Sequence, residues 1–501
     1  MDLFHELILG FGVAIQPVNL FYCFLGCLIG TLVGVLPGLG PTAAMSLLLP
    51  ATFHIPPVTA IIMLAGIYYG AMYGGSTTSI LVNIPGEAAS VMTCLDGYQM
   101  ARQGRAGAAL GMSAFGSFIA GTLGIVGMTI MAPPLASFAL KFGPPEYFSL
   151  MSMGMVVLSF LTGASMVRSL MMACFGLIVG MVGMDAVSGS TRFTFGVTDL
   201  MDGVGLVPLV MGLFGISEIL LNLEQKINRD IFKTTVKGLL PTVEDWIQAK
   251  WAILRGTVIG FILGILPGGG AVLSSFVAYA VEKRVSKYPE KFGTGVIEGV
   301  AAPESANNAA AQSAFIPLLT LGLPANVVMA LLLGALILHG VTPGPLLLTK
   351  HPDIFWGVIA SMYLGNVMLL VLNLPLIGLW VQLLKIPYPF MMPMIILFCV
   401  LGSYSVANSI TDVLLMLLFG LIGYLMKKLK FDAPPLVLAF VLGPLIEYYF
   451  KSSLMFSRGS FTVFFTRPIS LACLSISAAI LLWSIVAGLR RRPLPIPKEA
   501  P

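Results

Sequence analysis

The sequence GCLIGTLVGVLPGLG occupies residues 26–40, and a close variant of it, GTVIGFILGILPGGG, occupies residues 256–270. In both copies three glycines stand four residues apart, and a Leu-Pro-Gly-x-Gly segment follows them. Glycines at this spacing form a smooth stripe on an apolar helix, which allows a second helix to approach closely. Proline and glycine then end the helix. We therefore expect one broken helix in each half of the chain, while noting that glycine spacing alone usually reflects helix packing.

The composition places the whole chain in a membrane. Of 501 residues, 57% are hydrophobic and only 10% are charged, and the mean hydropathy is +0.95. Such a chain has too few charges to cover a soluble globule, and its apolar segments are long enough to span a bilayer. We expect an all-α polytopic membrane protein with about 10–14 transmembrane helices. No Lys or Arg precedes the first apolar stretch, so we expect this span to remain in the protein rather than act as a secretory signal.

The polar residues divide the chain into two repeats. We assign residues 1–224 to the first repeat, with a helical hairpin near 70–90, and residues 251–465 to the second, with a hairpin near 302–326. The polar, Lys- and Arg-containing stretch 225–250 is predicted to be a cytoplasmic linker. Residues 466–501 are expected to form a final transmembrane helix and a basic cytoplasmic tail.

Basic residues indicate that the two repeats are inverted. Four basic residues lie between positions 283 and 291, after the second glycine pattern, whereas the equivalent stretch 53–61 of the first half has none. Conversely, Arg102 and Arg105 follow the first hairpin, while residues 341–345 carry no charge. Because basic loops face the cytoplasm, equivalent loops should lie on opposite sides of the membrane. We expect a periplasmic N-terminus and a C-terminus held in the cytoplasm by the arginines at 490–492. Inverted repeats with interrupted helices are typical of secondary transporters.

Two segments rich in small polar residues could carry the chemistry: YYGAMYGGSTTSILVNIPGEAAS at 68–90 and APESANNAAAQSAFIPLLTLGLPAN at 302–326. We interpret both as polar turns of re-entrant hairpins that enter from opposite faces. Irregular backbone inside a membrane lines a protein-enclosed or water-filled cavity. Helix starts there attract anions, and hydroxyl, amide and carbonyl oxygens suit Na⁺. The alternative role of these clusters is hydrogen bonding between helices.

Acidic residues within apolar segments are costly, so they are candidates for ion coupling. Glu304 is the first choice for a coupling acid. Glu87 could instead begin a helix, and Glu298 could be a loop charge. Glu218 and Glu447 stand near the ends of spans, where an interfacial position is expected. No cofactor motif, ATP-binding loop or protein metal site is found, so the only expected small partner besides substrate is a coupling ion, Na⁺ or H⁺.

The motifs at 35–40 (VLPGLG), 69–87 (YGAMYGGSTTSILVNIPGE) and 303–309 (PESANNA) resemble those of the large membrane subunit of the tripartite tricarboxylate transporter family. The resemblance implies a permease of the bacterial inner membrane that imports carboxylates such as citrate with an ion gradient. It also implies a small four-helix membrane subunit, a periplasmic solute-binding protein and no nucleic acid, and it is compatible with a homodimer of the heterodimer. The hairpins look like those of elevator-type dicarboxylate and sialic-acid transporters, which is an analogy of fold.

Carried over by position, the resemblance implies a substrate- and ion-binding set in each half. The second half has Ala306 and Ala309 where the first has hydroxyls, so the halves are not expected to bind the same group. The implied residues are Gly38, Leu39, Gly40, Ser76, Thr77, Thr78, Ser79 and Asn83 in the first half, and Gly268, Gly269, Gly270, Ser305, Asn307 and Asn308 in the second.

Other functions remain open at this stage. The repeat alone also permits a stand-alone secondary transporter or a channel for another small solute. An intramembrane acyl or prenyl transferase would need a carboxylate pair or a histidine in a polar cavity, and no such arrangement is found in the sequence. A purely structural membrane partner is disfavoured because buried polar segments are expensive.

Overall fold

The computed structural model describes residues 3–36, 40–161, 166–185, 188–224, 238–268, 270–383 and 388–490. Within them, regular structure is helical except for one two-stranded hairpin. Seven helices of this part are long and apolar enough to cross a membrane, which makes the chain a multi-pass helical membrane protein. These seven are Pro17–Val35, Pro57–Val82, Ala106–Ala139, Leu206–Glu224, Pro352–Asn373, Ile410–Lys428 and Pro434–Phe456.

The first half begins with a core of tightly packed helices. Its elements are α1 (Leu3–Ala14), α2 (Pro17–Val35), α3 (Gly40–Leu48), η1 (Pro50–His54), α4 (Pro57–Val82), η2 (Ala88–Ser90), α5 (Val91–Arg102) and α6 (Ala106–Ala139). The three glycines of α2 lie directly against carbonyl groups of α4. A Cβ atom added to Gly30 would lie 2.5 Å from the Ile67 carbonyl oxygen, so only glycine allows this approach.

The second half repeats this packing. Its core elements are α11 (Val243–Ile265), α12 (Gly270–Val285), η5 (Pro289–Lys291), α13 (Glu298–Ser313), α14 (Phe315–Leu321), α15 (Val327–Leu338), α16 (Leu347–Lys350), α17 (Pro352–Asn373) and α18 (Ile377–Leu383). Gly256, Gly260 and Gly264 of α11 face carbonyl groups of α13. α13 also packs against α6, α5 and α4, so the two half-cores form one unit.

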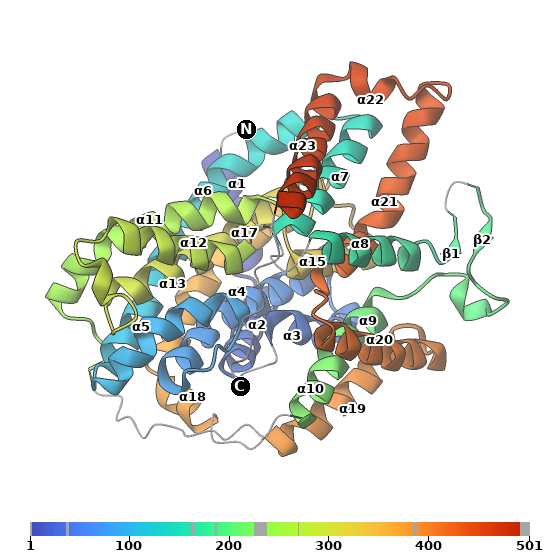
Figure 1. Cartoon of the computed structure of the whole chain (residues 1–501). Coiled ribbons are helices and arrows are strands. Elements are labelled where there is room, and N and C mark those ends of the chain that lie inside the picture. Colours follow the sequence, from blue (N-terminus) through green and yellow to red (C-terminus); the bar gives the residue numbers. More distant parts are fainter. Residues whose placement is uncertain are drawn as a thin grey trace, which may run out of the picture.

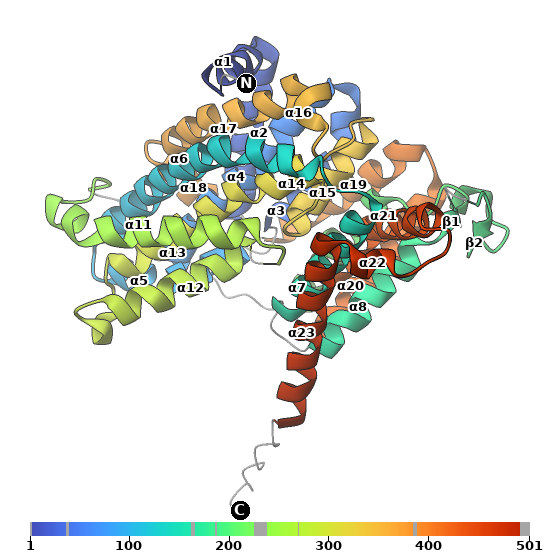
Figure 2. The same cartoon turned by 90° about the horizontal axis from the view of Figure 1, so that it is seen from above.

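The remaining elements surround this core. They are α7 (Pro144–Leu161), α8 (Met166–Gly180), β1 (Gly183–Met184), β2 (Thr191–Arg192), η3 (Thr198–Leu200), α9 (Leu206–Val210), η4 (Met211–Ile216), α10 (Ser217–Glu224), α19 (Tyr388–Ala407), α20 (Ile410–Lys428), α21 (Pro434–Phe456), α22 (Val463–Thr466) and α23 (Pro468–Arg490). α21 packs on α7 and α8, α23 packs on α7, and α20 packs on α9, η4 and α10. Figures 1 and 2 show α11, α12 and α13 on the side of the molecule opposite to α8 and α21.

The helix breaks occur later than the polar clusters. Residues 74–79 lie inside α4 and residues 305–313 inside α13, so our interpretation of these clusters as turns was wrong. Away from water a helix satisfies the backbone groups most completely, and side chains such as Ser79 bond back to the preceding turn, here to the Gly75 carbonyl at 3.0 Å. In the first segment the helix ends at Asn83, and in the second α14 follows α13 after Ala314 and ends at Gly322. Asn83 and Gly322 are both left-handed, with φ of 57° and 69°.

The predicted linker and tail are only partly described. Residues 225–237 and 491–501 lie outside the described part of the chain. Within the predicted linker, α11 already begins at Val243, because Thr242 and Asp245 form a reciprocal cap at its first turn.

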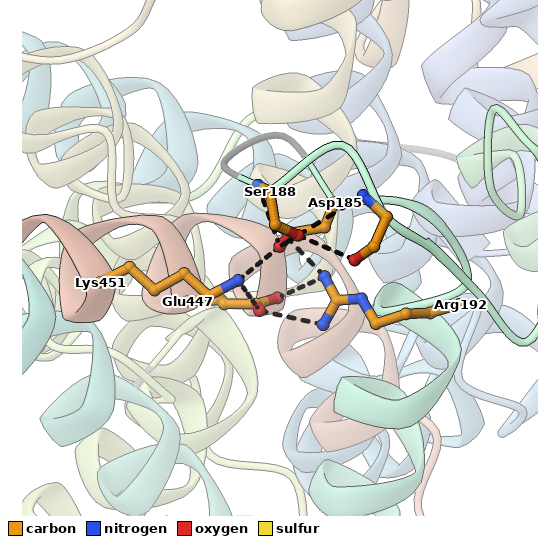
Figure 3. Close-up of polar contacts among 6 residues, drawn as sticks. Asp185, Ser188, Arg192, Glu447 and Lys451 are labelled. Atoms are coloured by element: carbon orange, nitrogen blue, oxygen red, sulfur yellow. Dashed lines mark hydrogen bonds and ion pairs between the residues drawn. The ribbon is translucent and has the colours of Figure 1, made fainter.

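A network of four charged side chains attaches the β1–β2 hairpin to α21 (Figure 3). Arg192 forms two hydrogen bonds with Glu447, at 2.9 and 3.1 Å. Lys451 bridges Asp185 at 2.6 Å and Glu447 at 2.7 Å. Glu447, which we expected at a membrane interface, therefore pairs with Arg192 of the hairpin and with Lys451 of its own helix.

Candidate functional site

A cavity of about 810 Å³ lies where the helix breaks of both halves meet. The starts of four helices line it: Gly40 of α3, Ala88 of η2, Gly270 of α12 and Val327 of α15. Other parts of the wall are formed by Leu158 and Leu161 of α7, Phe214 of η4, Glu218 of α10, and Asp432 and Pro434 at the start of α21. The two copies of the repeated sequence thus contribute to one site.

The starts of α3 and α12 differ from the other two. α3 and α12 begin with Gly40 and Gly270, whose φ angles of 57° and 50° favour glycine. The residues that precede them in the sequence, Leu39 and Gly269, carry no side-chain oxygen that could cap a helix. The first N–H groups of a helix lack partners within the helix and favour negative charge. These two starts are therefore suited to an anion.

The starts of η2 and α15 are capped by their own side chains. Glu87 accepts a hydrogen bond from the Ala89 N–H at 2.5 Å, and Asn326 accepts one from the Met329 N–H at 3.0 Å. These two residues occupy corresponding positions after the breaks, since 326 − 87 = 239 and the left-handed residues Asn83 and Gly322 differ by the same number. The caps thus place a carboxylate on one side of the cavity and an amide on the other.

Each cap also bonds to a side chain of the opposite half. The Asn326 amide donates to the Tyr68 hydroxyl at 3.1 Å, and the Asn307 amide donates to Glu87 at 3.2 Å. Tyr68 and Asn307 are themselves 239 positions apart, because 307 − 68 = 239. The pair of hydrogen bonds is thus reciprocal between the halves, and Tyr68, Glu87 and Asn326 all line the cavity.

The charged side chains in the described wall of the cavity are all acidic. Its lining contains Glu87, Glu218 and Asp432 but no Lys or Arg among the described residues. Glu218 is paired with Lys427 of α20, and burial raises the pKa of Asp432, in the loop before α21, above its usual value. Glu218, which we expected at an interface, therefore lies in the wall of this cavity, and the wall offers an anion only helix starts and neutral groups among its described residues.

Glu304 lies behind this cavity, in the middle of α13. It is completely buried and accepts hydrogen bonds from the hydroxyls of Ser76 on α4, at 2.5 Å, and Thr93 on α5. None of the ion pairs in the described part of the chain includes it. A carboxyl group so placed holds either a proton or a charge that needs a nearby cation.

The predicted site residues separate into several places. Gly40, Gly268 and Gly270 line the large cavity, whereas Ser76 and Thr77 line a much smaller one. Gly38, Leu39 and Gly269 lie outside the described residues. The others line neither cavity and are placed as follows.

Thr78, Ser79 and Ser305 make structural hydrogen bonds. Thr78 donates to the Val35 carbonyl at 2.6 Å, Ser79 to Ser90 at 2.9 Å and Ser305 to the Gly116 carbonyl at 3.3 Å. For Thr78 and Ser305 these bonds join helices, the alternative role considered for the polar clusters. Asn83 is exposed at the break after α4.

Asn307 and Asn308 lie buried on α13 behind the cavity. Asn307 reaches the site only through Glu87, and Asn308 donates to Ser117 of α6 at 2.7 Å. The Oδ1 atoms of both are buried without a hydrogen-bond partner.

Sequence reasoning missed Tyr68 and Asn326 as site residues. Both stand within the quoted motifs, and the offset between the Pro residues of the two breaks, 324 − 85 = 239, places Asn326 opposite Glu87. That offset was the available signal. Asp96 was also missed: it is fully buried and accepts hydrogen bonds from the N–H groups of Gly293, Gly295 and Val296. It fixes the loop before α13 against α5.

Comparison with known proteins identifies relatives along nearly the whole chain. An uncharacterized 52.8 kDa protein in the TAR-I ttuC′ 3′ region of Agrobacterium vitis is 51% identical over 492 residues, which cover 98% of each chain. An uncharacterized protein in the TAR-II ttuC′ 3′ region of the same organism is 51% identical over 233 residues, 46% of this chain and 96% of the relative. No solved structure matches the chain.

The family comparison confirms the resemblance found in the motifs. Residues 20–438 match the family described as the tripartite tricarboxylate transporter TctA family. Apart from α1 and the first residues of α2, this range includes the core of both halves, and it includes every residue named in the lining of the two cavities. The chain therefore belongs to the tripartite tricarboxylate transporter TctA family.

Proposed function

We propose that this chain is the large permease subunit of a binding-protein-dependent tripartite system and imports carboxylates, such as citrate or related di- and tricarboxylates, with an ion gradient. The observation that carries the proposal is the single cavity of about 810 Å³ lined by helix starts from both halves. Its volume falls within the range of small-molecule sites. The starts of α3 and α12, which follow residues without a side-chain oxygen in the sequence, would receive carboxylate groups, as half-helix starts do in secondary transporters.

The acidic wall supports coupling to a cation. A polycarboxylate that enters a cavity containing Glu87 and Asp432 meets like charges, and these must be compensated by Na⁺ or H⁺. Glu304, which lies behind Ser76 and belongs to none of the ion pairs in the described part of the chain, is our candidate for the coupling acid. Substrate and cation would then bind together, which is the requirement for symport.

We further propose that the halves are inverted repeats that move as an elevator. The offset of 239 residues relates both breaks, both caps and the reciprocal hydrogen bonds, and the basic loops alternate between halves. In this arrangement the N-terminus lies in the periplasm and the C-terminus in the cytoplasm. The core, with its cavity, would slide against the surrounding helices such as α7 and α21.

The system would include a small four-helix membrane subunit and a periplasmic solute-binding protein, as the family implies, assembled in the bacterial inner membrane. The decisive experiment reconstitutes the purified chain with the small subunit in liposomes. Uptake of a labelled carboxylate panel is measured with and without the binding protein, under a Na⁺ or a pH gradient.

We expect accumulation that requires both the binding protein and one of the gradients. Asn307→Ala and Ser76→Ala should abolish it in folded protein. Ser453→Ala, which removes a buried hydroxyl bonded to its own helix in α21, should not. Uptake that is equal without binding protein and without any gradient would overturn the proposal in favour of a channel or a stand-alone transporter.

A further inference from the structure

A second, very small cavity lies inside the core and shares no lining residue with the large one. Its volume is about 10 Å³, which is room for a single water molecule or an ion of that size. Oxygen-bearing side chains dominate its wall. The lining consists of Tyr73, Ser76, Thr77, Leu110, Ser113, Ala114, Asn373 and Ile377.

Asn373, at the end of α17, contributes an oxygen that nothing satisfies. Its amide nitrogen donates to the Leu369 carbonyl at 2.9 Å, but Oδ1 is buried and has no hydrogen-bond partner among the described residues. The residue is only 4% exposed. A buried polar oxygen left in this state has lost its hydration without a replacement, so the cavity favours an occupant that interacts with oxygen.

Ser76 shows which kind of occupant fits. Its single hydroxyl proton is directed to Glu304 at 2.5 Å, so the hydroxyl oxygen has no proton left to donate and can only accept or coordinate. Thr93 donates to the same carboxylate from α5. The small cavity therefore lies one hydroxyl away from a buried acid that lacks a counter-ion among the described ion pairs.

We propose that the small cavity is a Na⁺ site. The ligands are the hydroxyl oxygens of Ser76, Thr77 and Ser113 and Oδ1 of Asn373, and Glu304 balances the charge through Ser76. Neutral oxygens are the ligands expected for a hard cation, and one compensating carboxylate favours a monovalent ion over a divalent one. The Na⁺ site itself is argued from the cavity and does not depend on the proposed function. Only the role of this Na⁺ as the coupling ion rests on the proposed function.

The site joins both halves of the molecule. Ser76 and Thr77 belong to α4 and Ser113 to α6, whereas Asn373 ends α17 and Glu304 lies on α13. Bound Na⁺ would thus hold α17 and α13 against α4. The same helix, α4, carries Tyr68, which lines the large cavity.

The test measures binding of radioactive Na⁺ to the purified full chain in detergent, without substrate, binding protein or small subunit. Saturable binding is expected for the wild type. Ser113→Ala and Asn373→Leu should weaken the Na⁺ affinity by about tenfold or more, whereas Asn373→Asp, which keeps an oxygen at this position, should retain binding. Ser361→Ala on α17 is the matched control, because its buried hydroxyl donates to the Val358 carbonyl of its own helix and does not line the small cavity.

Folding is checked separately by thermal unfolding in Na⁺-free buffer, so that only variants that unfold like the wild type are compared. Absence of saturable binding, or equal affinity in Ser113→Ala, Asn373→Leu and Ser361→Ala, would overturn the proposal and leave a water molecule as the occupant. Because no carboxylate is present, this result is independent of the transport assay. Na⁺ binding can be observed in a protein that fails to import carboxylates, and import can be observed in a protein that binds no Na⁺ at this cavity.

Discussion

At the scale of single residues, each buried acid of the site is held by the opposite half of the chain. Glu304 of the second half accepts from Ser76 and Thr93 of the first, and Glu87 of the first half accepts from Asn307 of the second. A change in the proton or cation at either acid must therefore alter contacts between the halves. Under the proposed function, this would link ion binding to the geometry of the large cavity, as coupled transport requires.

Glu304→Gln should uncouple transport. Glutamine preserves the size of the side chain and can accept from a hydroxyl, but it lacks the charge that compensates a cation. We expect gradient-driven accumulation to fall by about tenfold or more while carboxylate affinity changes little. Reconstituted uptake with and without the gradient measures this. The control is Glu298→Gln, a half-buried acid at the first turn of the same helix, which should accumulate substrate normally. Normal substrate accumulation by the Glu304→Gln variant would exclude Glu304 as the coupling acid.

Asn326→Asp tests the charge balance of the large cavity. Aspartate caps a helix as well as asparagine does, so the free energy of unfolding should change by less than about 0.5 kcal/mol. It makes the second cap acidic like Glu87, and we expect carboxylate affinity to fall by about tenfold. Gln16→Asp, at the exposed start of α2, adds the same charge outside the cavity and should leave affinity unchanged. Equal affinities in the two variants would show that substrate does not approach α15.

At the scale of elements, the glycine stripes define how the broken helices are held. Gly→Ala at Gly30 would place a methyl group 2.5 Å from the Ile67 carbonyl oxygen, and at Gly260 it would overlap the Ala306 carbonyl. We expect each variant to lose about 1–3 kcal/mol of stability because the helices must separate. Gly12→Ala in α1 meets nothing within 4 Å and should be neutral or slightly stabilising. Thermal unfolding in detergent compares the three. A neutral Gly260→Ala would contradict the equivalence of the two stripes.

The charged network of Figure 3 makes a second prediction for an element, the β1–β2 hairpin. Glu447→Gln removes the negative charge from both hydrogen bonds with Arg192. It leaves Arg192 and Lys451 with Asp185 as their remaining anion in the network. We expect a loss of about 1–3 kcal/mol, seen as faster proteolysis of the hairpin. Glu224→Gln breaks an ion pair with Lys428 whose side chains are 43% and 46% exposed, and it should leave the stability of the hairpin unchanged because solvent screens this pair. Similar proteolysis of both variants would mean that the network does not hold the hairpin.

The sequence could predict the breaks but not the assignment of side chains to cavities. Glycine stripes and the Pro-Gly segments act on the local backbone, so their consequences are visible without a structure. Ser76 and Ser79 have the same local character, yet one faces Glu304 and the other bonds to Ser90. That difference depends on α13 and α5, which come from distant parts of the chain. Tyr68 was overlooked for the same reason, since its partner Asn326 lies in the other half.

At the scale of the whole molecule, the two halves exchange their last spans. α21 of the second half packs on α8 of the first, while α9, η4 and α10 of the first half pack on α20 of the second. Neither surrounding bundle can therefore form from one half alone. The large cavity lies between the core and these bundles, because α7 and η4 contribute Leu158 and Phe214 to its wall. A displacement of the core past the bundles would open the cavity to a different side of the membrane.

A disulfide between the core and α7 tests this displacement. A Cβ atom built on Gly154 of α7 lies 3.7 Å from the Cβ atom of Pro267, beside the break before α12, and this separation falls within the range of about 3.5–4.5 Å found across disulfides. If the core slides as an elevator, oxidised Gly154→Cys/Pro267→Cys protein should lose uptake in liposomes and regain it after reduction. Each single variant serves as a control and should be insensitive to oxidation. Full cross-linking with unchanged uptake would show that α7 and the second break keep a fixed separation during transport, so the alternation of access would have to arise within the core, from the caps at Glu87 and Asn326.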